Sequence, residues 1–158
     1  MKHKGFTLIE LLVTMGIIAV LTGMAVFNFN QARMRARDVQ RKSDLSQLVK
    51  SMELYKNDTG SYPAAAGDFQ TDMVNKGYFK TDFVDPRGST WWTYKYLPGT
   101  NNKTYYLMAC LENAADSTRA TTAQCANFPN NAGSGSECKC GGNDIANYSG
   151  VMYIVSNP

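Results

Sequence analysis

The chain has 158 residues, 44% of them hydrophobic, and a formal net charge of +3. This length allows one small domain. The charge is unevenly spread, because residues 28–42 carry five basic side chains against one acid, whereas residues 43–158 carry 9 basic and 11 acidic ones. A basic balance confined to one short stretch does not indicate a nucleic-acid-binding domain. The only histidine is His3, which argues against a histidine-dependent catalytic site, so the chain is not expected to be an enzyme.

The first thirty residues combine a short polar leader with a long apolar segment. Residues 1–5 are mostly polar, and the 22 residues of Phe6–Phe27 hold a single charge, Glu10. As a helix this segment would reach about 33 Å, enough to cross a bilayer. A secretory signal peptide would have a shorter apolar core, and a plain membrane anchor gives Glu10 no role. Because a carboxylate in mid-bilayer costs about 2.5–3.5 kcal/mol, Glu10 predicts a specific function.

The residues Lys4–Val13 form the motif KGFTLIELLV, which resembles the class III signal of type IV pilins and type II secretion pseudopilins. The resemblance implies that a prepilin peptidase cuts after Gly5 and methylates Phe6. It also implies that Glu10 pairs with the N-terminal ammonium of a neighbouring subunit, and such a pair offsets the cost of burying either charge. The helix dipole also favours an acid in the first turn, which is the alternative role of Glu10. Many family members have a proline where this chain has Phe27.

The helix is expected to continue beyond the apolar segment. Apolar side chains recur every three or four positions within residues 45–55, which predicts one buried stripe. This stripe consists of Leu45, Leu48, Val49, Met52 and Tyr55. Proline and glycine are absent from Met24 to Thr59. The residues Asn57–Gly60 are a typical helix stop. Residues 6–57 are therefore predicted to form one helix, apolar all round over 6–27 and amphipathic over 28–57.

A run of basic residues follows the apolar segment. It consists of Arg33, Arg35, Arg37, Arg41 and Lys42. We expect this run to form a solvated or subunit-bridging collar just outside the membrane. DNA and anionic lipid headgroups are the alternative ligands, because both present phosphates to basic side chains.

Residues 58–158 are predicted to form a globular head. Its entry, Gly60–Pro63, is similar to the αβ-loop of pilin and pseudopilin heads, and Asp85–Gly88 with the aromatic residues after it resembles the segment before the first strand of major pseudopilins. A short helix is expected to start near Phe69 and end at Lys76 and Gly77. Three strands are predicted at Trp91–Leu97, Thr104–Leu111 and Gly150–Ser156, the first two joined by the turn Pro98–Lys103. The fold class is α+β, a pilin-like fold with a small antiparallel sheet on the second half of the helix.

Residues 112–144 are predicted to form a long cysteine-rich surface loop, held by disulfides because loops of this length are uncommon without cross-links. The four cysteines are Cys110, Cys125, Cys138 and Cys140. A bridge between Cys138 and Cys140 would be strained, so each is expected to pair with Cys110 or Cys125, which leaves two connectivities. A cysteine-only zinc site is the alternative. The segment Gly141–Tyr148 resembles the end of the calcium loop of major pseudopilins, which implies Asp144 as a calcium ligand, although few other acids lie near it.

The resemblance implies a structural subunit of a type IV pilus-like extracellular filament that serves motility, adhesion or DNA uptake. The chain would enter the inner or cytoplasmic membrane as a single-pass prepilin, be processed, and polymerise through its N-terminal helix into a surface pilus. Its partners would be identical subunits, the prepilin peptidase, an assembly platform protein with ATPase-driven machinery, membrane lipids before assembly, and DNA. No cofactor is required. The alternatives are a major pseudopilin of a type II secretion system and a membrane-anchored surface binding domain.

Overall fold

The structure is a computed structural model, and it describes residues 5–64, 69–88, 91, 94–125, 139–140 and 150–157. The chain divides into two compact units, with the boundary between Ala36 and Arg37. Helix α1 (Leu8–Thr59) begins in the first unit and ends in the second.

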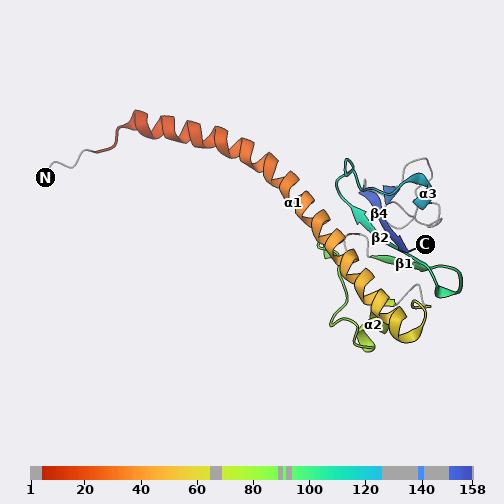
Figure 1. Cartoon of the computed structure of the whole chain (residues 1–158). Helices are drawn as coiled ribbons and strands as arrows, with labels where there is room; N and C mark the ends of the chain where they lie inside the picture. Colours follow the sequence, from red (N-terminus) through yellow and green to blue (C-terminus); the bar gives the residue numbers. More distant parts are fainter. Residues whose placement is uncertain are drawn as a thin grey trace. The chain divides into compact units, whose positions relative to one another are not determined.

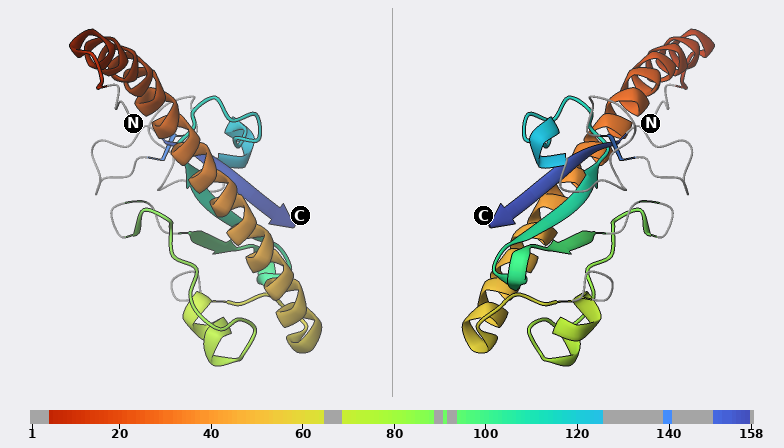
Figure 2. Two further views of the ribbon diagram at one scale, coloured as in Figure 1. Left: turned by 90° about the vertical axis from the view of Figure 1, so that its left-hand side faces the viewer. Right: turned by 90° about the vertical axis from the view of Figure 1, so that its right-hand side faces the viewer.

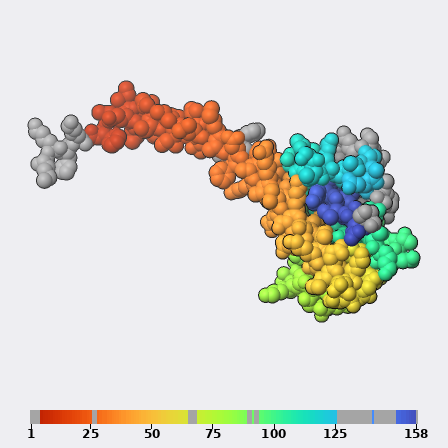
Figure 3. Space-filling model, in the orientation of Figure 1, coloured from red at the N-terminus to blue at the C-terminus, as the bar shows by residue number. Residues whose placement is uncertain are grey.

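The first unit contains the apolar part of α1. Every side chain from Gly5 to Ala25 is exposed, Phe6 by 84% and Leu8 by 82%. Figure 3 shows the start of the helix, in red, open on the face in view. The most apolar window of α1 has a mean hydropathy of 2.2, so by length and composition this helix can cross a membrane. An apolar surface of this extent needs lipid or protein to cover it, because its exposure to water is unfavourable.

The second unit combines the rest of α1 with a short helix and an antiparallel sheet. Its further elements are α2 (Phe69–Asn75), β1 (Lys95–Pro98), the 3-10 helix η2 (Thr100–Asn102), β2 (Tyr105–Leu111), α3 (Thr122–Cys125), β3 (Lys139–Cys140) and β4 (Gly150–Asn157). The strand order is β1-β2-β4-β3, and each neighbouring pair is antiparallel. Within this unit the sheet crosses the C-terminal part of α1, and α2 lies near the end of that helix (Figures 1 and 2).

The sheet is buried on both faces. One face packs on α1 and α2 in a core cluster that includes Leu45, Leu48, Met52, Phe69, Met73, Tyr96, Tyr105 and Leu107. The opposite face carries a second core cluster, which contains Trp91, Met108, Cys110, Ala120, Cys125, Cys140, Met152 and Ile154. Every residue of β2 except Tyr106 is therefore buried. Since strand side chains alternate between faces, such a strand requires cover on both sides.

Helix α1 ends at a glycine, as the sequence predicts. The Gly60 N–H donates to the Lys56 carbonyl at 2.8 Å, and Gly60 has φ +80°. This left-handed conformation is typical of the residue that follows a helix, and glycine adopts it without steric cost.

The α+β fold class, the long helix, the short helix α2 and the β1–β2 hairpin are confirmed. The head also has two features that the sequence did not predict. The sheet has a fourth strand, β3, which at two residues is too short to leave a pattern in the sequence. The cysteine-rich segment is also more than a surface loop, because its buried Ala120, Cys125 and Cys140 cover the second face of the sheet.

Candidate functional site

The N-terminal end of α1 is closed by a reciprocal contact between Thr7 and Glu10. The hydroxyl and the backbone N–H of Thr7 donate to Glu10 Oε2, at 2.7 and 2.9 Å. The Glu10 N–H donates back to Thr7 Oγ1 at 3.4 Å, and the Leu11 N–H donates to the Thr7 carbonyl at 3.3 Å. This is a capping box, in which the two side chains satisfy N–H groups that a helix start leaves free. Glu10 therefore already has a partner within its own chain.

Gly5 and Phe6, the two residues of the predicted cleavage bond, lie ahead of the helix and are exposed. A Cβ atom added at Gly5 would meet no atom within 4 Å. Nothing in the described part of the chain therefore requires a glycine at this position. A surface hollow nearby is lined by Phe6, Ile9, Glu10, Val13 and Thr14. An exposed bond outside regular structure is accessible to a protease.

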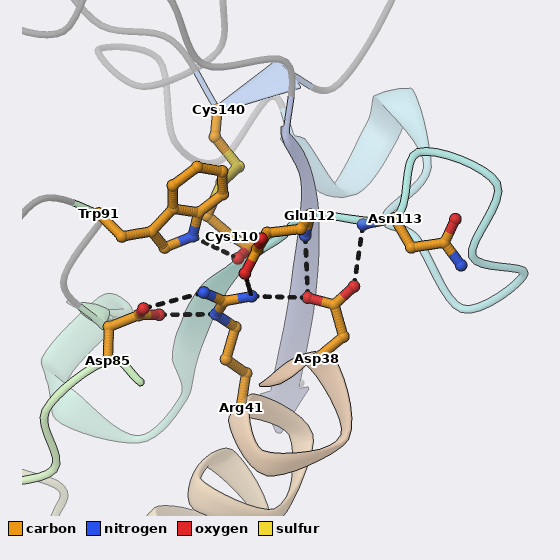
Figure 4. Close-up of a disulfide and its surroundings, with 8 residues drawn as sticks. All are labelled: Asp38, Arg41, Asp85, Trp91, Cys110, Glu112, Asn113 and Cys140. Carbon is orange, nitrogen blue, oxygen red and sulfur yellow. Dashed lines mark hydrogen bonds and ion pairs between the residues drawn. A yellow bond between two sulfur atoms is a disulfide. The ribbon is translucent and has the colours of Figure 1, made fainter. Parts of the chain in front are cut away.

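Arg41 is the centre of a buried ion cluster in the second unit, shown in Figure 4. Its side chain is fully buried, and its guanidinium forms a bidentate pair with Asp85, with Nε–Oδ2 at 2.6 Å and Nη2–Oδ1 at 2.9 Å. Nη1 donates to Asp38 Oδ1 at 2.7 Å and to Glu112 Oε1 at 2.8 Å. Asp38 also accepts the backbone N–H groups of Glu112 and Asn113, at 2.8 and 2.9 Å. The cluster thus ties α1 to the turn before β1 and to the end of β2.

Two further arginines and a tryptophan surround this cluster. Arg37 forms a bidentate pair with Glu112, at 2.7 and 2.6 Å, and Arg87 lies 3.5 Å from the same carboxylate. The Trp91 ring centroid is 5.2 Å from Arg41 Cζ and 4.5 Å from Arg87 Cζ. Three arginines therefore face three carboxylates, and their formal charges balance. Bidentate geometry with balanced charge is the arrangement that best offsets the cost of desolvation.

The cluster favours the ionised states of Arg41 and Glu112. Burial alone would lower the pKa of Arg41, but its hydrogen bonds to Asp85 and Glu112 outweigh burial and raise the pKa. Burial alone would raise the pKa of Glu112, but the hydrogen bonds from Arg37 and Arg41 hold the pKa below its ordinary value. The ion pairs of Glu112 consequently persist to lower pH than the ordinary pKa of a glutamate would allow.

The basic run was predicted to be a solvated or subunit-bridging collar; the solvated form is wrong for most of the run, and the subunit-bridging form stays a prediction. Arg41 is fully buried, and Arg37 and Lys42 are only partly exposed because both pair with acids of the head. Arg33 and Arg35 alone in this run are exposed. Local charge counting fails here because, apart from Asp38, the acids that neutralise the run lie far along the chain.

A signal for the buried arginine was present in the sequence. Asp38 and Arg41 lie seven and four residues before Leu45, and this helical spacing places them on the same face as the apolar stripe of α1. Two charged residues on a buried stripe predict ion pairing, because an isolated buried charge is strongly unfavourable. The partners Asp85 and Glu112 could not be identified in the same way, since only the folded chain brings them to this face.

A disulfide joins Cys110 of β2 to Cys140 of β3 beside the ion cluster (Figure 4). The two Cα atoms are 5.9 Å apart, and the pairing is one of the two that the sequence left open. Cys125 is also disulfide-bonded. Cys138 and Asp144, the remaining predicted site residues, lie outside the described residues. Among the residues that the structure describes, no three His, Cys, Asp or Glu side chains gather into a metal site.

A polar contact links the C-terminal end of β4 to α1. The Tyr62 hydroxyl donates to Glu53 Oε1 at 2.7 Å and accepts from Asn157 Nδ2 at 2.8 Å. Burial and the bond to Glu53 raise the pKa of Tyr62 to about 12. The hydroxyl thus stays protonated and keeps donating across the neutral pH range.

Comparisons with known proteins agree with this architecture. Residues 1–26 match the family model for the prokaryotic N-terminal methylation motif. The chain is 46% identical over 59 residues to the type IV wide pilus major component PilA4 of Thermus thermophilus, which covers 37% of this chain and 45% of that protein. It is 31% identical over 112 residues to the type II secretion system core protein G of Pseudomonas aeruginosa, covering 63% and 77% of the two chains.

The core protein G of Escherichia coli is 36% identical over 100 residues, 56% of this chain and 69% of that protein. The chain thus spans about half of the Thermus pilus component and a larger share of the two secretion proteins. A comparison with solved structures returned no match.

A methylation motif at the start of a membrane-length helix, followed by a small sheet on the second part of that helix, defines a pilin-like protein. The chain belongs to the family of type IV pilins and type II secretion pseudopilins.

Proposed function

We propose that this chain is a subunit of a type IV pilus-like filament, and that it polymerises through α1 after a prepilin peptidase removes residues 1–5 and methylates Phe6. The observation that carries the proposal is the exposed apolar surface of residues 6–25, in which Glu10 is the only charged residue. Such a surface fits a lipid bilayer before assembly and a bundle of identical helices afterwards. The membrane precursor would then become part of a filament on the cell surface.

Glu10 is the proposed assembly residue. Its carboxylate accepts both Thr7 donors in the single subunit. In a filament it would also accept the ammonium that cleavage creates on a neighbour's Phe6, and that pairing would offset the desolvation of both charges. The capping box holds the acceptor near the helix start, where a staggered neighbour would present its N-terminus.

A structural role fits the contents of the head better than catalysis does. Its buried polar residues pair with one another across elements, as in the Arg41 cluster, and so serve to fix the fold. The partners of the chain would then be its own copies and the enzymes and platform proteins that process and assemble them. A calcium ion at Asp144, which lies outside the described residues, stays a proposal.

The Glu10→Ala variant tests the assembly role. We expect the variant precursor to be inserted and cleaved normally, because neither step needs the carboxylate, but to form no filaments. Electron microscopy of sheared surface filaments and mass spectrometry of the subunit measure both steps. Asp82→Ala, which removes an exposed acid of the head, is the matched control and should assemble normally. Normal filaments from Glu10→Ala would contradict the proposal.

A pseudopilin of a type II secretion system is the second candidate. The observation that favours it is the extent of the alignments with core protein G, which cover 112 and 100 residues against 59 for the Thermus pilus component. Deletion of the gene separates the two functions. Loss of secreted enzymes from the medium, with surface filaments unchanged, would support the pseudopilin. Loss of surface filaments with secretion intact would support the pilin.

A further inference from the structure

Trp91 contacts both the disulfide-bonded Cys110 and the guanidinium of Arg41. The Trp91 Nε1–H donates to the Cys110 carbonyl oxygen at 2.9 Å, and the same Cys110 carries the sulfur bonded to Cys140. The face of the indole lies over the Arg41 guanidinium at 5.2 Å. Figure 4 shows this order of sulfur, indole and guanidinium.

Trp91 belongs to the second core cluster of the head and covers Arg41 on that side. It is 5% exposed and packs with both cysteines of the disulfide. Arg41 itself is 0% exposed, so little water reaches its ion pairs. The strength of these pairs depends on that exclusion, because charge–charge attraction falls as the local dielectric rises.

The packing around the disulfide is tight on the side of β4. A Cβ atom added at Gly150 would lie 2.5 Å from Cys110 Sγ, 2.8 Å from the Leu111 carbonyl oxygen and 3.2 Å from Trp91 Cζ2. Gly150 pairs with Cys140, and β4 lies between β2 and β3 in the sheet. The sulfur and the indole are therefore packed against the same small residue, at a position where a larger side chain would not fit.

We infer that oxidation of Cys110 and Cys140 fixes Trp91 over Arg41, which makes the attachment of the head to α1 sensitive to the redox state of this one disulfide. In the oxidised chain the bond holds β3 beside β2 and keeps the Cys110 carbonyl in position for the indole N–H. In the reduced chain the two-residue strand β3 keeps its pairing with β4 and the packing of Cys140 in the second core cluster, but it loses its covalent link to β2. Trp91 then loosens, water reaches the guanidinium, and the pairs with Asp38, Asp85 and Glu112 weaken.

The redox step needs an external oxidant of the disulfide class. Two thiols lose two protons and two electrons when the Cys110–Cys140 bond forms, and an oxidised dithiol protein or glutathione disulfide accepts them and leaves as two thiols. Such oxidants act outside the cytoplasm in bacteria. The head would thus reach its fixed attachment to α1 only after export. That this oxidation follows export rests on the proposed function, whereas the effect of the disulfide on Arg41 does not.

The accessibility of Arg41 tests the inference directly in the full-length chain in detergent. The arginine reagent phenylglyoxal is applied, and peptide mass spectrometry compares the labelling rate of Arg41 with that of the exposed Arg35. We expect removal of the disulfide in C110A/C140A to raise the relative rate about tenfold or more, because the cover opens. The matched control C125A/C138A, which keeps Cys110 and Cys140, should stay within about twofold of the parent chain.

Two further measurements guard against general unfolding. Amide exchange of residues 45–52 should remain slow in C110A/C140A, because the core cluster between α1 and the sheet does not contain the disulfide. W91F keeps the disulfide but lacks the indole donor, and it should also increase Arg41 labelling. Unchanged Arg41 labelling in C110A/C140A would overturn the inference. Faster labelling accompanied by loss of amide protection over residues 45–52 would also overturn it, because the head would then have unfolded as a whole. Because neither readout involves filaments, failure here is distinct from failure of the proposed function.

Discussion

Replacement of Arg41 by Met measures the contribution of the buried ion cluster to the stability of the head. Met is unbranched and roughly fills the aliphatic space of Arg, but it leaves three carboxylates without their shared cation. The side chains concerned are 0–9% exposed, so solvent screens their interaction little. Removal of one partner from a buried ion pair costs about 3–5 kcal/mol. A small domain has about 5–15 kcal/mol in total, so the loss would be a large part of it.

Thermal unfolding of the full-length protein in detergent, followed by near-UV circular dichroism of the head aromatics, is the assay. At about 3–5 °C per kcal/mol for a domain of this size, the Tm of Arg41→Met should fall by about 10–20 °C. Arg35→Met changes an exposed arginine on the same helix and should alter stability by less than about 0.5 kcal/mol. A loss below about 1 kcal/mol for Arg41→Met, or an equal loss for Arg35→Met, would refute the reasoning.

A double-mutant cycle isolates the principal pair of the cluster. Arg41→Met and Asp85→Asn, alone and combined, should give a coupling energy toward the upper end of the roughly 0.5–3 kcal/mol range that contacting residues show. The expectation rests on the bidentate geometry, with both bonds at 2.9 Å or less. Additive effects of the two substitutions would mean that the pair contributes no net stability.

Three further predictions concern other parts of the chain. Gly150→Ala should destabilise the head by about 1–3 kcal/mol in thermal melts, because the new Cβ would overlap the Cys110 sulfur; unchanged stability would contradict this close packing. Burial alone would raise the pKa of Asp116, but the hydrogen bonds from Lys42 and Thr118 outweigh burial and lower the pKa to about 2. With an unfolded pKa of about 3.9, the stability from Asp116 is full above that value and lost as pH falls toward 2, so Lys42→Met should flatten this part of the Tm profile. Gly5→Val should leave uncleaved, membrane-inserted precursor on immunoblots, and normal cleavage would show that no small residue is needed.

The elements of the fold follow from local patterns in the sequence. The apolar repeat within residues 45–55 and the stop at Gly60 predicted α1 closely, because both depend on residues near one another in the chain. The hairpin of β1 and β2 was predicted for the same reason. The start of the first strand was not, since Trp91 lies before β1 (Lys95–Pro98), where its indole covers Arg41.

The candidate functional residues likewise fall into those that the sequence predicts and those that it does not. The motif around Gly5, Phe6 and Glu10 is contiguous and could be identified from the sequence alone. The Arg41 cluster could not, because its partners Asp85 and Glu112 are 44 and 71 residues away. Side chains that far apart in the chain become neighbours only through the topology of the sheet. The charge pattern of a short stretch of sequence does not predict that topology.

The order of the strands has a consequence for biosynthesis. β4, which begins about 90 residues after the end of α1, lies between β2 and β3 and pairs with both. At a synthesis rate of about 5–20 residues per second, the buried face of α1 emerges several seconds before the strand that completes its cover. During that interval the stripe around Leu48 is exposed while the apolar segment is already available to the membrane. Until β4 is synthesised, this core therefore lacks Tyr153 and Val155, which pack against it in the folded head.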